Sequence, residues 1–143
     1  MKRSKLFFLH FALFVLIAAT ALSCGGCRNV TEIKTGNGAV TVESIGEGDK
    51  SFVLEVVNDD TLISKFTVHT DKNTVGEALL DLGVIKGDNG QYGLYVKTVD
   101  GITVDYDKDG AYWAFYVDGQ YASQGVDSTE IDEGCKYMLK VER

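Results

Sequence analysis

The residues best suited to hold a metal ion form the run 105–110, with the sequence DYDKDG. Acids at every second position, followed by a glycine, reproduce the first half of a calcium-binding loop, in which carboxylate oxygens coordinate the ion. The second half is missing, because Tyr116 stands where such a loop has a bidentate glutamate. We expect either a weak calcium-like site at Asp105, Asp107 and Asp109 or a solvated turn that holds no metal.

The sequence gives little support for catalysis. If an N-terminal leader is removed, His69 is the only histidine, and it falls on the polar face of a predicted strand. A hydrolase needs a general base within reach of its nucleophile. The pair Ser128-Thr129, beside Asp127, has no such base nearby in the sequence. We therefore expect that the protein is not an enzyme.

A second candidate binding surface is the aromatic segment 112–121, which alternates like a β-strand. Alternation places Trp113 and Phe115 on one face and Tyr112 and Tyr116 on the other. If the first pair packs inside the domain, the tyrosines are exposed; the reverse assignment is open, and so is burial of both faces. Exposed aromatic side chains with a polar rim often mark recognition surfaces.

Three motifs follow one another in the second half of the chain: residues 75–80 (VGEALL), residues 99–102 (VDGI), and the aromatic segment with Gly125-Val126 after it. In this order and spacing they resemble the transcobalamin-like C-terminal domain, a DUF4430-type domain of Gram-positive lipoproteins that also occurs in animal vitamin B12 carriers. The resemblance covers roughly residues 65–142.

The resemblance implies a ligand and a set of contacts. In the animal carriers, the matching segment belongs to the domain that closes over one face of a corrinoid, so cobalamin or a related tetrapyrrole is the expected small-molecule ligand. Those carriers hold the other face with a helical domain for which this chain has no room, so we expect a transporter component or second binding protein to complete the site. The candidate ligand-binding residues are Tyr112, Trp113, Gly125 and Val126 from the resemblance, Tyr116 from the tyrosine face, and Tyr121 and Gln124 as loop neighbours.

Two other functions fit the same residues. A calcium-like metal-binding module would use the acids of the run 105–110, and a cell-envelope module would present the aromatic segment to a partner protein.

Nucleic acid is not an expected partner, since binding it needs a concentrated basic patch and the formal net charge is −7.

The N-terminal region predicts export. Residues 1–23 combine basic residues, an apolar stretch and small residues before Cys24, as a signal peptide does. The sequence Ala21-Leu22-Ser23-Cys24 resembles a lipobox, so we expect Cys24 to carry a diacylglyceryl group that anchors an extracytoplasmic lipoprotein to the cell membrane. Plain secretion is the alternative.

The remaining chain predicts a tether and one domain. Residues 24–38 have few large apolar side chains and read as a flexible tether, which leaves 39–143 as the domain. Thr74 and Glu77 form a capping box before a helix at 75–82, which Gly83 ends. Strands are expected at 40–43, 51–57, 62–70, 94–99, 102–106, 112–117, 121–123 and 135–142. This order predicts an α+β fold, with one short helix packed on a mostly antiparallel sheet in a grasp-like layout.

Overall fold

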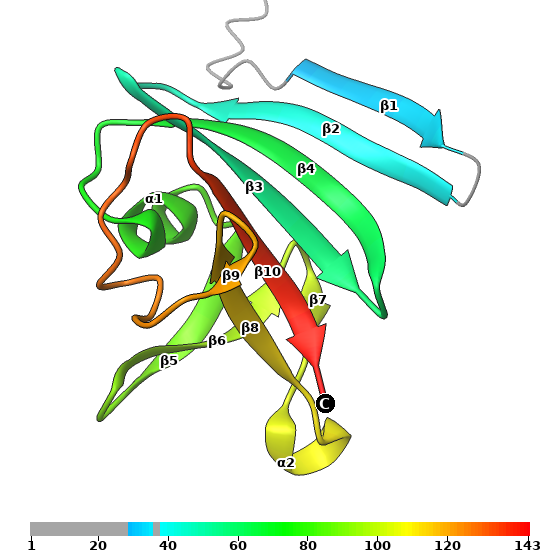
Figure 1. The fold of residues 1–143 in the computed structure, drawn as a ribbon, viewed down its shortest axis with the longest axis vertical. Coiled ribbons are helices and arrows are strands. Elements are labelled where there is room, and N and C mark those ends of the chain that lie inside the picture. The colour runs from blue at the N-terminus through cyan, green and yellow to red at the C-terminus, as the bar shows by residue number, and fades with distance from the viewer. Residues whose placement is uncertain (1–28, 36–37) are drawn as a thin grey trace, which may run out of the picture.

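The computed structural model describes residues 29–35 and 38–143 (Figure 1). The larger sheet contains β1 (Asn29–Thr35), β2 (Gly38–Gly46), β3 (Lys50–Asn58), β4 (Thr61–Thr70), β8 (Tyr112–Val117), β9 (Gln120–Tyr121) and β10 (Lys136–Glu142). The smaller sheet contains β5 (Ile85–Gly90), β6 (Gly93–Val99) and β7 (Ile102–Thr103), and the helices are α1 (Val75–Asp81) and α2 (Tyr106–Asp109). Within the described residues, neither helix is long and apolar enough to cross a membrane.

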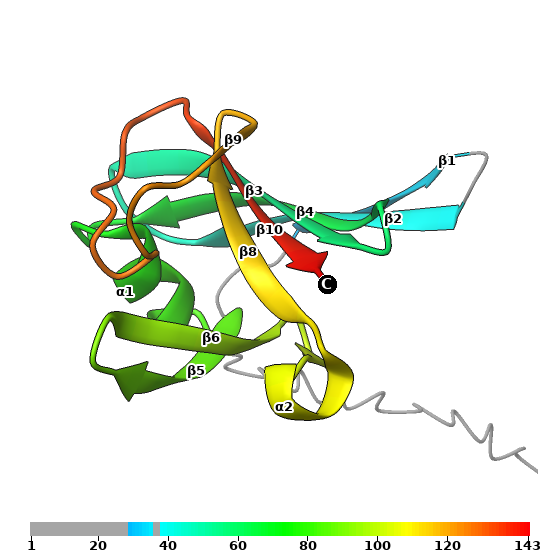
Figure 2. The ribbon, with the colours of Figure 1, turned by 60° about the horizontal axis from the view of Figure 1, so that its bottom comes forward.

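The expected α+β, grasp-like fold with one helix on a mostly antiparallel sheet is wrong. The chain is mostly β and forms a seven-stranded sheet, in the order β1-β2-β4-β3-β10-β8-β9, and a three-stranded sheet in the order β5-β6-β7. The larger sheet is mixed, because β10 runs parallel to β3 and β2 runs parallel to β4. Figure 2 shows the smaller sheet on one side of the larger sheet, with α1 between them at one end.

The two sheets enclose the core. Along β3 and β4, alternate side chains are buried, and these two strands, both predicted from the sequence, form an antiparallel hairpin. Asp59 and Asp60 form its turn with φ angles of 47° and 60°, the left-handed conformation that suits two-residue hairpins. The buried residues at the centre of the core are Phe52, Leu54, Val56, Val68, Leu79, Ile85, Val99, Tyr137 and Leu139.

The predicted helix is confirmed as α1. The Thr74 side chain accepts a hydrogen bond from the Glu77 amide at 3.2 Å, and the Glu77 side chain accepts one from the Thr74 amide at 3.3 Å. These two bonds satisfy backbone donors that the first turn of a helix leaves unpaired. The helix buries Val75, Ala78 and Leu79 in the core.

Strand β1 lies within the range 24–38 that the composition predicts as a flexible tether. It pairs antiparallel with β2, from Asn29 opposite Ser44 to Thr35 opposite Gly38. Strand pairing therefore starts before the domain boundary expected at residue 39. The leader 1–23 and Cys24 lie outside the described residues, and their roles stay predictions.

Candidate functional site

Strand β8 positions the central aromatic residue of the site. Trp113 and Phe115 lie opposite Val141 and Leu139 of β10, and both are buried, with exposed fractions of 7% and 8%. Tyr112 and Tyr116 alternate with them and are half-buried. Of the assignments that alternation leaves open, the structure shows the one with Trp113 and Phe115 inside, but the tyrosines on the other face are not fully exposed as that assignment expected.

A cavity of about 290 Å³, here named the Trp113 cavity, lies beside this strand. Every candidate ligand-binding residue except Tyr116 lines it, together with parts of β6 and β10. Its full lining is Leu94, Tyr95, Val96, Tyr112, Trp113, Phe115, Tyr121, Ala122, Ser123, Gln124, Gly125, Val126 and Leu139. The structure thus gathers six residues that are spread from 112 to 126 around one hollow.

Helix α1 fixes the loop that closes the Trp113 cavity. The Gly76 amide donates a hydrogen bond to the Val126 carbonyl oxygen at 2.7 Å, and the Val75 amide donates one to the Thr129 carbonyl oxygen at 2.9 Å. Val126 itself is buried, with an exposed fraction of 2%. The loop wall of the cavity is therefore attached to the helix by backbone bonds, which hold it in one position.

Two buried polar atoms near the cavity have no hydrogen-bond partner among the described residues: Trp113 Nε1 and Asp127 Oδ1. Such atoms are rare in folded proteins, because a buried polar group without a partner keeps the cost of losing water. The Asp127 carboxylate packs against two glycines, since a Cβ on Gly93 would lie 2.5 Å from Oδ2 and one on Gly125 would lie 2.7 Å from Oδ1. Both atoms mark polar positions that the protein itself does not satisfy.

Tyr116 lies outside the cavity and pairs with other side chains. Its hydroxyl donates a hydrogen bond to Glu142 Oε1 at 2.8 Å, and this bond raises the pKa of the Tyr116 phenol. Its ring meets the Tyr121 ring edge-on, with centroids 5.4 Å apart. A hydrogen bond with Tyr121 is the main cause that raises the pKa of Tyr112. Tyr116 thus supports the exposed Tyr121 ring instead of forming part of the cavity wall.

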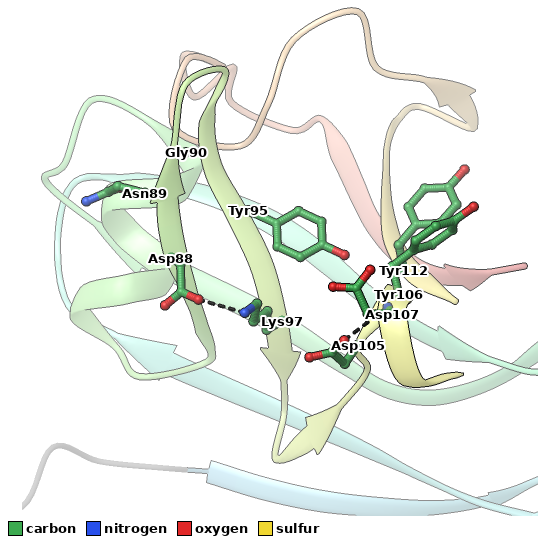
Figure 3. A pocket seen from close by; sticks show the side chains of 9 residues that line it. All are labelled: Asp88, Asn89, Gly90, Tyr95, Lys97, Asp105, Tyr106, Asp107 and Tyr112. Atoms are coloured by element: carbon green, nitrogen blue, oxygen red, sulfur yellow. Dashed lines mark hydrogen bonds and ion pairs between the residues drawn. The ribbon is translucent and has the colours of Figure 1, made fainter. Parts of the chain in front are cut away.

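A second cavity of about 630 Å³ adjoins the first at Tyr95 and Tyr112, which line both (Figure 3). Its lining is Asp88, Asn89, Gly90, Tyr95, Lys97, Asp105, Tyr106, Asp107 and Tyr112, and we name it the acidic cavity. Lys97 Nζ lies 2.7 Å from Asp88 Oδ2 and 5.9 Å from the centre of the Tyr95 ring. The hydrogen bond to Asp88 raises the pKa of Lys97, so this ammonium group stays charged and is already paired.

Tyr95 lines both cavities but is not among the residues that the sequence predicts for the site. Figure 3 shows it extending from β6 at the acidic cavity; it also lines the Trp113 cavity, and 40% of it is exposed. The alternation of Leu94 and Val96 with Tyr95 in the predicted strand 94–99 was a usable signal, since it leaves a large aromatic ring on the polar face. Tyr95 is separated in the sequence from the aromatic segment 112–121, so the sequence alone did not indicate that they line the same cavity.

The predicted metal ligands form a helical turn and do not form a metal cage. Asp105 caps α2 by accepting a hydrogen bond from the Asp107 amide at 3.1 Å, and Asp109 Oδ2 accepts one from the Asp105 amide at 2.8 Å. The strand expected at 102–106 stops at Thr103 as a result. Asp105 and Asp107 line the acidic cavity, whereas Asp109 does not. Within residues 29–35 and 38–143, no three His, Cys, Asp or Glu side chains gather as a potential metal site.

The fold and this segment order define a known class of domain. The chain belongs to the DUF4430 family, a domain of unknown function, whose pattern matches residues 72–143. The resemblance to transcobalamin-like domains is confirmed by this match and by the fold comparison below. No curated protein sequence matches the chain.

Two solved structures share the fold. A proposed metal binding protein from Ruminococcus gnavus ATCC 29149 is 28% identical, with a TM-score of 0.61 over 66% of this chain and 98% of that chain. Haptocorrin in complex with Cbi is 19% identical, with a TM-score of 0.50 over 66% of this chain. The match spans only 25% of haptocorrin, and at this identity it concerns the fold alone. Neither description names an enzymatic reaction.

Proposed function

We propose that this protein is an extracytoplasmic lipoprotein that binds a small ring-bearing ligand, cobalamin or a related tetrapyrrole, at the Trp113 cavity. One observation carries the proposal: residues 112, 113, 121 and 124–126, which the family resemblance and the aromatic pattern single out, line one hollow. That hollow also holds the indole of Trp113, whose Nε1 has no partner among the described residues. The haptocorrin complex with Cbi supports the ligand class through the shared fold.

The size of the cavity argues for an incomplete site. Pockets for small molecules usually measure about 300–1,000 Å³ and enclose most of the ligand. The Trp113 cavity, at about 290 Å³, is too small to enclose a tetrapyrrole, so the ligand would be covered on one side only. The chain alone should therefore bind the ligand weakly but saturably, and tight binding would need a second surface, which a transporter component or another binding protein would supply. The match covers only 25% of haptocorrin, which agrees with a site in which this chain covers one side of the ligand and another protein covers the other side.

A metal-binding module is the second candidate function, because the Ruminococcus gnavus neighbour is described in these words. Asp105 and Asp107 line the acidic cavity and would be its first ligands. Asp109 does not line this cavity, so only two of the three predicted acids lie together there. Two carboxylates supply fewer oxygen ligands than the about six to eight that calcium takes, and for this reason we place the corrinoid proposal first.

Binding of cobalamin, measured by equilibrium dialysis, tests the proposal. We expect saturable binding that weakens roughly tenfold in Tyr121→Ala and in Gln124→Ala, because each removes an exposed side chain at the cavity mouth. Tyr92→Ala is the matched control, since Tyr92 is 93% exposed and does not line either cavity. Absence of saturable binding, or equal loss in all three variants, would contradict the proposal.

A further inference from the structure

Three tyrosine rings from three different elements line the acidic cavity (Figure 3). Tyr95 lies on β6, Tyr106 on α2 and Tyr112 on β8. Tyr95 and Tyr106 are 40% and 60% exposed, and the rings of Tyr106 and Tyr112 meet edge-on, with centroids 6.4 Å apart and planes at 63°. Because this edge-on contact leaves the two rings unstacked, both can offer aromatic surface to the cavity that they line.

The lining of this cavity carries a negative charge. Three carboxylates against one ammonium give it a formal charge of −2. Lys97 Nζ lies 2.7 Å from Asp88 Oδ2, so these two charges balance each other. Asp105 Oδ2 lies 3.8 Å from Lys108 Nζ, but the Lys108 side chain is 80% exposed, and such a pair is weak. Asp107 has no ion-pair partner among the described residues. The α2 side of the cavity therefore receives little positive charge from the protein.

One cation of the protein itself already lies in this cavity. Lys97 Nζ is 5.9 Å from the centre of the Tyr95 ring and contacts the Asp88 carboxylate. The negative face of an aromatic ring attracts a cation at this distance, and an adjacent carboxylate adds to the attraction. Among the described residues, no lysine or arginine lies over the rings of Tyr106 and Tyr112. The rings and carboxylates of the α2 side can therefore receive a cation from outside the chain.

We infer that the acidic cavity binds a quaternary ammonium group with no anion beside it, such as that of choline, at Tyr106, Tyr112 and Asp107. The two rings contact its methyl groups, and the carboxylates of Asp107 and Asp105 balance its charge. The Trp113 cavity is a different hollow, although it shares Tyr95 and Tyr112 with the acidic cavity. The inference therefore does not depend on the corrinoid proposal.

Hydration and hydrogen bonding favour a quaternary ammonium group over other cations. Calcium needs more oxygen ligands than Asp105 and Asp107 supply. A primary ammonium group is compact and strongly hydrated, and its three N–H donors need acceptors. Asp105 Oδ1 already accepts a hydrogen bond from the Asp107 amide. Because a quaternary ammonium group has no N–H, aromatic faces and nearby carboxylates are sufficient to bind it.

Choline and its neutral isostere 3,3-dimethylbutan-1-ol test the role of charge, since they have the same shape and differ only in nitrogen or carbon at one position. In NMR titrations of the full chain, followed at the backbone amides of Tyr106 and Asp107, we expect saturable binding of choline with a dissociation constant on the order of 1 mM. The alcohol should bind at least roughly tenfold more weakly. Equal affinities would overturn the inference, and so would absence of saturable choline binding.

The same cation occurs in a free small molecule and in the phosphocholine headgroup of a lipid. Asp88, Asp105 and Asp107 repel a phosphate placed next to the cation, so the charge of the cavity favours the free form. We expect phosphocholine to bind at least roughly threefold more weakly than choline. Equal or tighter binding of phosphocholine would overturn the inference of a cation without an adjacent anion.

The variants Tyr106→Leu and Asp107→Asn test the ring and the carboxylate separately. Both side chains are exposed and line the acidic cavity but not the Trp113 cavity, so neither change should alter the fold or binding of cobalamin. We expect each change to weaken choline binding by roughly three- to tenfold. The matched controls are Tyr92→Leu, at a tyrosine that is 93% exposed, and Glu133→Gln, which removes one negative charge outside the lining of the cavity. Unchanged affinity in either site variant, or an equal loss in the controls, would overturn the inference.

Discussion

The amide of Gly76 donates a hydrogen bond to the carbonyl oxygen of Val126 at 2.7 Å, so the first turn of α1 holds the end of the 119–126 loop. A Cβ on Gly76 would lie 2.8 Å from the Cα of Asp127, a separation that real Cβ atoms essentially never show. Helix and loop backbones thus meet where a side chain would otherwise stand. Since Val126 lines the Trp113 cavity, α1 sets the position of one of its walls.

The substitution Gly76→Ala should separate the helix from the loop. Its methyl group would press on the Asp127 backbone, and we expect a loss of about 1–3 kcal/mol in the free energy of unfolding, although alanine favours a helix more than glycine does. Urea unfolding followed by Trp113 fluorescence measures this loss. In the control Gly90→Ala, the new Cβ would meet only the Gly93 carbonyl oxygen at 3.5 Å, and we expect little change. Equal stability of the two variants would show that the close contact is not required.

Local signals in the sequence were sufficient for the helix and for the alternation of side chains along β8. The capping box of Thr74 and Glu77 depends on residues three positions apart, so it can be read from the chain directly. Alternation also placed Trp113 and Phe115 on one face, although only the structure shows that this face is the buried one. Both signals act within a few residues.

Strand β5 and the parallel pairings could not be predicted in this way. Residues 87–90 (GDNG) are typical of a turn, yet they pair with β6 after a bulge between Lys86 and Gly87. Gly87 is required there because a Cβ would lie 2.1 Å from the Tyr95 carbonyl oxygen. The parallel pairs β2 with β4 and β3 with β10 depend on long-range contacts, and strand periodicity does not identify a partner. The Trp113 cavity is lined by residues of both β6 and β8, so its full lining could not be predicted from the sequence either.

The pair Tyr116 and Glu142 should make stability sensitive to acid. The Tyr116 hydroxyl, and then Lys140, hold the pKa of Glu142 below its ordinary value of 4.5. A carboxylate with a lowered pKa stabilises the fold above its ordinary pKa, and this contribution is lost as the pH falls through the folded value. In Tyr116→Phe, we expect the pKa of Glu142 to rise and the loss of stability on acidification to shrink. Carboxyl ¹³C NMR titration measures the first effect, and urea unfolding at neutral and acidic pH measures the second.

Tyr92→Phe is the matched control for this titration, because Tyr92 is 93% exposed. It should leave the pKa of Glu142 unchanged. An unchanged pKa in Tyr116→Phe as well would show that Lys140, at 3.3 Å from Glu142 Oε1, accounts for the lowered pKa without the phenol.

Asp105 should act as a helix cap. Its Oδ1 accepts a hydrogen bond from the Asp107 amide at 3.1 Å, so Asp105→Ala should cost about 1 kcal/mol, whereas asparagine can accept the same bond and should cost less. We expect both values to be the same with calcium and with a chelator. A melting temperature that rises with calcium, and no longer does so in Asp107→Asn, would instead support the metal-binding module.

Cys24 should determine where the protein is found. Its lipobox-like context, Ala21-Leu22-Ser23, predicts a thioether-linked diacylglyceryl group, and two acyl chains give stable anchoring where one chain gives only marginal binding. Cells grown with labelled palmitate should therefore label the wild type and leave Cys24→Ser unlabelled. Cys27→Ser is the matched control, because it removes a nearby thiol outside the lipobox and should keep both the label and the membrane association. Label that persists in Cys24→Ser would exclude this anchor, and a wild type without label would favour plain secretion.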